Sequence, residues 1–498
     1  MALPSSVAKG EQMGSWSAAL RLAAGLLLLA ALPAAVRTAG AQGAPLAAID
    51  AYVQERMAAW DVPGLALVAI DDGRVVLQRG YGYADHEAGT PMTDTTLVAL
   101  GSTGKALTAL AVLQLVQQGR VRLDAPVTDY LPYFRVADPC GAQITLRQLL
   151  SHTAGLPASG IAEAAWDADA LERHVRALAA VHLRRAPGSG WEYANNGFTI
   201  AGLVVQAVAG LPYEQYMREQ VLRPLGMTRA TFDPTDGAAG SLAQGYYHRG
   251  EALVPYPPPL SRSDAPAGGV LASAADAASY LLALLHDGTH DGQSVVSPAS
   301  IAEMWTPQAS VSDTLAYGLG WYLGDLDGQP AAWHSGSQLT TGSRFIVAPA
   351  EQRAVAVLTT TDDEAKEEIA DGVLALLRGA APERRAVPSP RGPNTYVPDP
   401  TDWDAYQGEY VLPFDRLRVY REGTHLRGRL PNVELQLEAL SDHTFVIHAS
   451  PPLLEGAVVD FRPDGAGRMA LWLGDELFGT PAAPTAPKAD GGSVDACD

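Results

Sequence analysis

The chain has 498 residues, more than one compact core usually holds, so at least two domains are expected. Apolar residues make up 47% and charged residues 18%, a balance that allows a buried core and excludes fibrous, collagenous and wholly disordered proteins. With 35 Lys plus Arg against 55 Asp plus Glu, the net charge is −20. Such a chain repels a phosphate backbone, so nucleic acid is excluded as a partner.

The first 41 residues have the pattern of a secretory signal peptide. Positively charged residues precede an apolar run from Leu22 to Val36, and small residues up to Ala41 follow it. The run contains Pro33 and, at about 15 residues, is shorter than the ~20 needed to span a bilayer, so a cleaved signal is expected rather than an uncleaved anchor. The mature protein would then begin at Gln42, be secreted or periplasmic, and keep no stable membrane span.

The region after the signal alternates helical and strand-like patterns. Helices are predicted over 45–60, 102–119, much of 145–216, and 363–378. Strand-like runs are found at 64–70, 75–84, 317–325, 331–335, 343–348 and 353–360. Strands at both ends with helices between them predict one mixed antiparallel sheet with a helical layer, an α/β (α+β) fold.

The last part of the chain is predicted to form a second domain. A linker over 386–402 has five prolines in 17 residues, which disfavours both a helix and a central strand. Residues 403–480 alternate short β runs with turns, the pattern of a small barrel or sandwich. The main domain would therefore cover 42–385, and the tail 481–498 is expected to be disordered.

Cys140 and Cys497 are the two cysteines of the chain. Two are too few for a disulfide framework, and they lack the spacing of a zinc site. Because Cys497 lies one residue from the end of the tail, we expect two unpaired thiols.

Ser102 and Lys105 stand three residues apart at the start of an apolar helix, so both side chains share one face. A serine needs a base to become a nucleophile, and a lysine can serve only when neutral, a state that burial and a helix N-terminus favour. The spacing alone is weak, because Ser6 and Lys9 repeat it in the signal peptide. A long side chain that snorkels from a half-buried helix is the alternative interpretation of Lys105.

Tyr193 and Asn195 follow a Pro-Gly-Ser-Gly turn and precede a helix predicted to begin near Gly197. The phenol could relay a proton between a serine and a leaving group, and the amide could hold both Lys105 and a substrate carbonyl. Taken alone, a loop tyrosine and a helix-capping asparagine explain the same triplet.

His334, Gly336 and Ser337 lie at the end of a strand-like run. A strand edge there could pair with an extended acyl substrate, and the Ser337 N–H could point at an oxyanion. His286 and His290, with aspartates beside them, suggest a metal site, but glycines place them in a turn after a helix. Solvated loop histidines are the better interpretation, so no metal site is predicted.

Taken in order, SxxK at 102–105, YxN at 193–195 and HxG at 334–336 resemble the active-site boxes of the serine β-lactamase and penicillin-binding protein superfamily. Within it the chain is most similar to the class C β-lactamase-related serine hydrolases, which include DD-carboxypeptidases, D-amino-acid peptidases and esterases. The sequence outside the three boxes also resembles this family, at 62–85, 146–157, 187–210 and 266–280. The resemblance covers about 45–380 and implies a β-lactamase/transpeptidase-like fold. The β-rich part resembles the lipocalin-like C-terminal domain of some members.

The resemblance also implies a role for each residue of the boxes. Ser102 would be the acylated nucleophile, and its N–H and that of Ser337 would form the oxyanion hole. Lys105 would take the Ser102 proton. Tyr193 would pass a proton to the leaving group and later help to activate the deacylating water, while Asn195 would orient the substrate.

Two departures from the family pattern concern the third box. His334 stands where many β-lactamases have the lysine of a KTG box. Histidine at this position resembles certain DD-peptidases and peptidase or esterase relatives, and it weakens the positive charge that would hold a β-lactam carboxylate. The family often has glycines soon after this box, whereas here Ser337 follows and Gly342 comes late, so the oxyanion loop is expected to differ in shape.

We therefore expect an exported serine hydrolase that cleaves a peptide, amide or ester bond through an acyl-serine intermediate, foremost a peptidase or esterase of small-molecule or peptide substrates. A β-lactamase or a DD-carboxypeptidase/penicillin-binding protein is the alternative. A catalytically silent protein that binds or senses cell-wall peptides is the alternative of another class. No metal or organic cofactor is expected, because the chain supplies nucleophile, base and oxyanion donors. Association into a homo-oligomer is left open.

Overall fold

The computed structural model describes residues 43–157, 165–237, 241–249, 252–387, 400–411, 416–423, 425–430, 433–439, 443–450, 458–463, 469–473, 476–481 and 497. The expected signal peptide, most of the expected linker and nearly all of the expected disordered tail lie outside the described residues. Within the described ranges, no helix is both long and apolar enough to cross a membrane.

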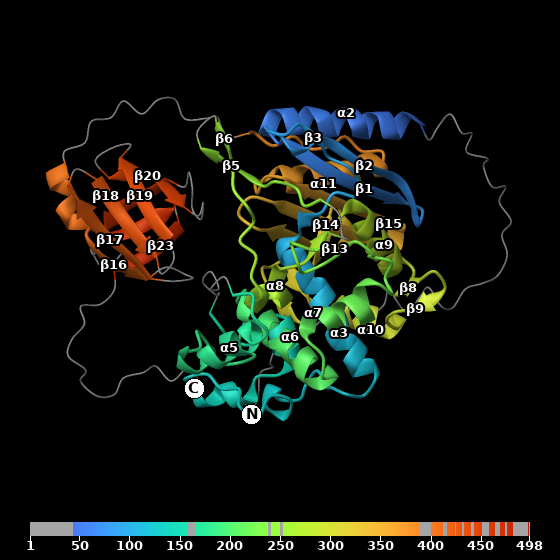
Figure 1. Ribbon diagram of the computed structural model, residues 1–498, viewed down its shortest axis with the longest axis horizontal. Helices are drawn as coiled ribbons and strands as arrows, with labels where there is room; N and C mark the ends of the chain where they lie inside the picture. Colours follow the sequence, from blue (N-terminus) through green and yellow to red (C-terminus); the bar gives the residue numbers. More distant parts are fainter. Residues whose placement is uncertain are drawn as a thin grey trace, which may run out of the picture. The chain divides into compact units, whose positions relative to one another are not determined.

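A nine-stranded antiparallel sheet forms the centre of the main domain (Figure 1). Its strands lie in the order β10-β11-β12-β13-β14-β15-β1-β2-β3. Their bounds are β1 (Gly64–Asp71), β2 (Arg74–Asp85), β3 (Thr90–Pro91), β10 (Ala309–Ser310), β11 (Ala316–Tyr317), β12 (Tyr322–Leu326), β13 (Gln329–Ser337), β14 (Gly342–Ala348) and β15 (Arg353–Thr359). The predicted sheet, built from both ends of the domain, is confirmed.

Helices cover both faces of this sheet. In Figure 1, α2 runs along the top of the view above the strands, while α3, α6 and α10 lie below them. The helices are α2 (Gly43–Trp60), α3 (Gly104–Gln117), α4 (Leu146–Leu150), α5 (Ala170–Ala177), α6 (Asn195–Ala209), α7 (Tyr213–Tyr216), α8 (Ala265–Gly268), α9 (Ala274–Leu285), α10 (Pro298–Met304) and α11 (Ala365–Leu377). Short pairs β4 (Val98–Ala99) with β7 (Leu271–Ala272), β5 (Tyr246–Arg249) with β6 (Ala252–Pro255) and β8 (Thr289–His290) with β9 (Gln293–Ser294) complete this region.

The central strand β1 shows why the sheet needs helices on both sides. Leu65 and Leu67 pack in the core shared with α2 and α11, whereas Ala66 and Val68 pack in the core of the helical layer. All four side chains are fully buried, so β1 is a continuous apolar run rather than an alternating one. Burying a side chain such as Leu67 contributes about 1.5–3 kcal/mol.

The C-terminal strands form a closed antiparallel barrel. They are β16 (Gly408–Val411), β17 (Arg416–Glu422), β18 (His425–Leu430), β19 (Val433–Ala439), β20 (Thr444–Ser450), β21 (Val458–Pro463), β22 (Met469–Leu473) and β23 (Glu476–Pro481). In β17, Leu417 and Val419 are buried while Arg416 and Arg418 are exposed, the alternation that a barrel wall requires. The barrel-or-sandwich prediction is confirmed as a barrel.

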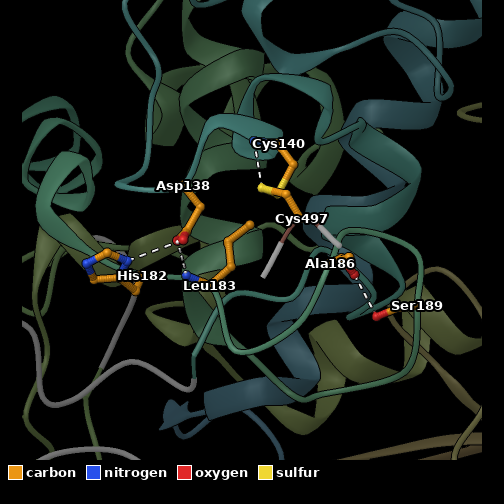
Figure 2. The surroundings of a disulfide bond; sticks show 7 residues. All are labelled: Asp138, Cys140, His182, Leu183, Ala186, Ser189 and Cys497. Carbon is orange, nitrogen blue, oxygen red and sulfur yellow. Dashed lines mark hydrogen bonds and ion pairs between the residues drawn. A yellow bond between two sulfur atoms is a disulfide. The ribbon is translucent and has the colours of Figure 1, made fainter. Parts of the chain in front are cut away.

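Cys140 and Cys497 are joined by a disulfide bond, with 5.5 Å between their Cα atoms (Figure 2). The expectation of two unpaired thiols is therefore wrong. A separation of 357 residues gave no local signal that the two would meet. Cys140 lies in a 3₁₀ turn (Pro139–Gln143), next to Asp138, whose carboxylate accepts the Leu183 N–H at 2.7 Å. The disulfide thus lies beside the segment that leads toward Tyr193.

The buried carboxylate of Glu368 connects α11 to α2. It accepts hydrogen bonds from Arg56 Nη2 at 3.1 Å, from Trp60 Nε1 at 2.6 Å and from the Arg385 N–H at 2.8 Å. Its side chain is 1% exposed, so these three donors replace its water.

Replacing Glu368 with Ala should lower the free energy of unfolding by about 3–5 kcal/mol, because the buried Arg56 guanidinium loses its main counter-charge. Urea unfolding would measure the loss. Asp167→Ala is the control, since it breaks an exposed pair with Arg173 and should change stability by less than about 1 kcal/mol. Equal losses in the two variants would contradict the prediction.

Candidate active site

Ser102 lies in the 3₁₀ turn η1 (Gly101–Thr103), which leads directly into α3. The preceding Leu100 carbonyl accepts the Thr103 hydroxyl at 3.0 Å and the Ser343 hydroxyl at 2.6 Å. Because Ser343 belongs to β14, the turn is fixed to the sheet. Ser102 is therefore presented at the positive N-terminal end of a buried helix.

Two glycines bring the end of β13 against this turn. Gly101 has φ +57°, and a Cβ there would lie 2.6 Å from the Ser337 nitrogen. A Cβ on Gly336 would lie 1.8 Å from the Leu100 carbonyl oxygen. Since no side chain fits at either position, the backbones can approach this closely only with glycine. The Ser337 amide consequently lies next to Ser102.

Lys105 is the second residue of α3 and is fully buried. Its Nζ lies 2.9 Å from Ser102 Oγ and 2.6 Å from the Ala267 carbonyl oxygen. Burial lowers the Lys105 pKa to about 7, while the nearby Asp264 carboxylate acts in the opposite direction. The amine does not snorkel to solvent, and its burial favours the neutral form.

Tyr193 lies close to Lys105, with its ring centroid 5.1 Å from Lys105 Nζ. Burial raises the Tyr193 pKa well above its usual value, and a side-chain hydrogen bond with Ser102 offsets part of that effect. Tyr193 is therefore a neutral phenol at physiological pH. It can pass a proton between neighbouring groups but does not start as an anion.

Asn195 is the first residue of α6. Among the described residues, its buried Oδ1 has no hydrogen-bond partner. The expected contact between this amide oxygen and Lys105 is thus not formed, and Lys105 donates to the Ala267 carbonyl instead. The unpaired Oδ1 is an acceptor beside Tyr193 that a bound ligand can use.

His334 is buried in β13 and is neutral. Its Nδ1 lies 2.6 Å from the Ser335 carbonyl oxygen, which can only accept, so Nδ1 carries the proton. The Nε2 lone pair then accepts the Tyr317 hydroxyl at 3.0 Å. Burial and the Lys105 charge lower the His334 pKa to about 3. His334 supplies neither a positive charge nor a free lone pair.

The edge of β13 beside His334 is open. Its pairing with β12 ends where Tyr322 meets Trp333, whereas its pairing with β14 continues to Ser337 opposite Gly342. Backbone groups of the last four residues of β13 on the β12 side therefore have no strand partner among the described residues. This edge is suited to an extended acyl chain.

Sequence reasoning missed His152, which folds against Tyr193. Their ring centroids are 4.2 Å apart, and His152 Nδ1 accepts the Ala194 N–H at 3.1 Å. Burial, followed by the charges of Lys105 and His334, lowers the His152 pKa well below its usual value. The residue belongs to a segment that the family resemblance covers, but nothing local predicted a contact 42 positions away.

Three further aromatic residues near the boxes were also missed. Tyr322 lies 5.3 Å from His334 between ring centroids, and Trp191 lies 6.3 Å from Tyr322. Tyr317 packs 4.8 Å from Tyr322 and holds His334. Together with Tyr193 they form a largely uncharged wall beside Ser102.

His286 and His290 lie outside this site. His290 is in the short strand β8, 3.6 Å from the Asp291 carboxylate, and His286 ends the helix α9. The described part of the chain contains no group of three or more His, Cys, Asp or Glu side chains arranged to hold a metal ion.

Burial of Lys105 should make stability depend on pH. The folded pKa of about 7 is below the unfolded value of about 10.4, so between these pH values the unfolded state binds more protons and stability rises with pH. Compared with Lys105→Met, the wild type should gain up to about 1.4 kcal/mol per pH unit between pH 7 and 10. Urea unfolding of both proteins at pH 7, 8 and 9 would measure this, and a difference independent of pH would contradict it.

Comparisons with known proteins found relatives named as penicillin-binding proteins. Penicillin-binding protein 4 of Amycolatopsis lactamdurans is 34% identical over 316 residues, which cover 60% of this chain and 81% of that protein. The putative penicillin-binding protein PbpX of Bacillus subtilis is 34% identical over 261 residues, and the match spans 62% of its length and 52% of this chain. The structure of the octameric penicillin-binding protein homologue from Pyrococcus abyssi superposes with a TM-score of 0.60 at 27% identity, covering 87% of this chain and 99% of that one.

The model of the Beta-lactamase family matches residues 49–380, the region that contains η1, α6 and β13. This is about two thirds of the chain. The chain belongs to the Beta-lactamase family.

Proposed function

We propose that the protein is an exported serine hydrolase that cleaves a peptide, amide or ester bond through an acyl-Ser102 intermediate. The observation that carries this proposal is the buried amine of Lys105, 2.9 Å from Ser102 Oγ. Such an amine costs the fold stability and supports no packing that methionine would not, whereas a neutral amine beside a hydroxyl is what a serine nucleophile requires.

The two candidate bases differ in their proton affinity. Lys105 has a pKa of about 7, so at neutral pH its lone pair can accept the Ser102 proton while an N–H donates to Ala267. Tyr193 has a raised pKa and holds its proton. We therefore assign Lys105 as the base of acylation and Tyr193 as the relay that protonates the leaving group.

In the proposed reaction, Ser102 Oγ attacks the substrate carbonyl as its proton moves to Lys105. The N–H groups of Ser102 and Ser337 stabilise the oxyanion. As the carbon–heteroatom bond breaks, Tyr193 donates its proton to the leaving group and is reprotonated from Lys105. Water then attacks the acyl-serine with Tyr193 and Lys105 in reversed roles, while Asn195 Oδ1 accepts an N–H or O–H of the substrate.

The neutral state of His334 favours a peptidase or esterase over a β-lactamase or DD-carboxypeptidase. Ligands of the latter two enzymes carry a carboxylate near the scissile bond, and His334 offers it no positive charge. The names of the two penicillin-binding relatives support the DD-carboxypeptidase alternative. A silent sensor of cell-wall peptides is disfavoured, because a binding protein has no use for a deprotonated Lys105.

Export is supported by two independent features. The N-terminal segment has the charge and apolar pattern of a secretory signal. The disulfide between Cys140 and Cys497 is stable in an oxidising compartment and rare in the cytosol.

Ser102→Ala should abolish hydrolysis of a neutral activated ester such as phenyl butyrate. Intact-mass measurement should show a trapped acyl group on the wild type after rapid quenching and none on the variant. If Ser102→Ala hydrolyses the ester at the wild-type rate, the nucleophile is wrong. If the wild type hydrolyses no ester or peptide while still binding cell-wall peptides, the silent-sensor alternative is correct.

The value of kcat/KM for this ester should rise with pH through about 7 as Lys105 loses its proton, and then level off. Lys105→Arg, which stays protonated, should lose about 10²–10⁴-fold at every pH. Stopped or continuous assays between pH 5.5 and 9 would test both. Activity that falls as the pH rises through 7 would contradict Lys105 as the base.

A further inference from the structure

The Asp362 carboxylate is hydrogen-bonded to Ser337, the residue whose N–H we assign to the oxyanion hole. The Ser337 hydroxyl donates a hydrogen bond to Asp362 Oδ2. Asp362 follows β15 and precedes α11, and its side chain is 15% exposed, whereas Ser337 is exposed. Standard bond lengths then place this carboxylate within about 6 Å of the Ser337 nitrogen.

The Asp362 carboxylate also pairs with Lys366 of α11. Lys366 Nζ donates to Asp362 Oδ1 at 2.9 Å and to the Asp363 carbonyl oxygen at 2.8 Å, and it lies 3.5 Å from Glu367 Oε2. Burial opposes the charge of Lys366, but Asp362 and Glu367 raise its pKa above the usual value. Lys366 is therefore a cation whose charge is already balanced.

The other charged groups near Ser337 in the described part of the chain do not add a free positive charge. Arg344 of β14 pairs with Asp371 at 3.1 Å, and His248 Nε2 lies 3.9 Å from the Asp363 carboxylate. His334 points to the opposite face of β13 from Ser337 and is neutral. Among the described residues, Lys366 and Arg344 are paired with carboxylates and Lys105 donates to the Ala267 carbonyl, so the charged group that contacts Ser337 directly is the Asp362 carboxylate.

We infer that Asp362 is a specificity-determining residue that excludes anionic groups from the position beside Ser337, so that the enzyme takes neutral or amine-bearing esters and amides. The inference rests on the proposed function. A substrate carboxylate placed there would meet a like charge at short range. The Ser337 hydroxyl and the Lys366 ammonium could donate hydrogen bonds to a substrate carboxylate, but both already donate to Asp362.

Asp362→Asn tests the inference. The amide oxygen keeps an acceptor for Ser337, but the negative charge is lost and Lys366 keeps Glu367 as a charged partner. The substrates are phenyl butyrate and 3-carboxyphenyl butyrate, which share one acyl group and differ by one carboxylate. The measured quantity is the ratio of kcat/KM for the anionic ester to kcat/KM for the neutral ester.

The ratio should rise about tenfold or more in Asp362→Asn. Glu367→Gln is the matched control, because it removes a carboxylate from the same lysine without touching Ser337, and its ratio should stay within about twofold of the wild type. An unchanged ratio in Asp362→Asn, or an equal rise in both variants, would overturn the inference. If the wild type hydrolyses neither ester, the proposed function itself fails, and the inference with it.

A second measurement does not depend on the folding of any variant. In the wild type, raising the ionic strength from about 0.05 to 0.5 M shortens the screening length from about 14 to 4 Å and should increase the ratio. A ratio that falls or stays constant with salt would contradict repulsion by Asp362.

Discussion

The main constraint on this molecule is an amine that must remain out of water. Lys105 can act as a base only if its charge is destabilised, and that requires α3 to be buried along its length, with the Ala267 carbonyl as a local partner. The same burial that activates the amine opposes folding. The large apolar core around α3, continuous with the sheet, supplies the stability that offsets this cost.

Neutrality extends from Lys105 to the rest of the site. Burial keeps His334 neutral while Tyr317 hydrogen-bonds to its ring, and His152 is buried against Tyr193. If any of these groups gained a proton, it would carry an uncompensated charge in an apolar wall. Under the proposed mechanism, protons would move among Ser102, Lys105 and Tyr193 in an environment of mostly uncharged side chains.

Those parts of the fold and of the candidate site that depend on contacts between residues close in sequence were predictable. The three-residue spacing of Ser102 and Lys105 predicts their contact, although Ser102 lies in the 3₁₀ turn just before α3. The unbroken apolar run of β1 indicates a strand covered on both sides. Contacts between distant segments were not predictable. Tyr317 contacts His334, His152 packs against Tyr193, and Cys497 is bonded to Cys140. In each case the two residues come from different segments, and the periodicity of a sequence does not predict such contacts.

The pairing of β1 with β15 has a consequence for how the chain acquires its structure. Leu65 lies opposite Thr359, so the centre of the sheet is closed by segments made early and late in synthesis. Until residues 353–359 exist, the β1–β2 hairpin has one open, fully apolar edge and no way to complete its core. Such long-range closure slows folding, because loop entropy must be lost before the contacts form. A chain that stops short of β15 would therefore be prone to aggregation rather than form a smaller stable fold.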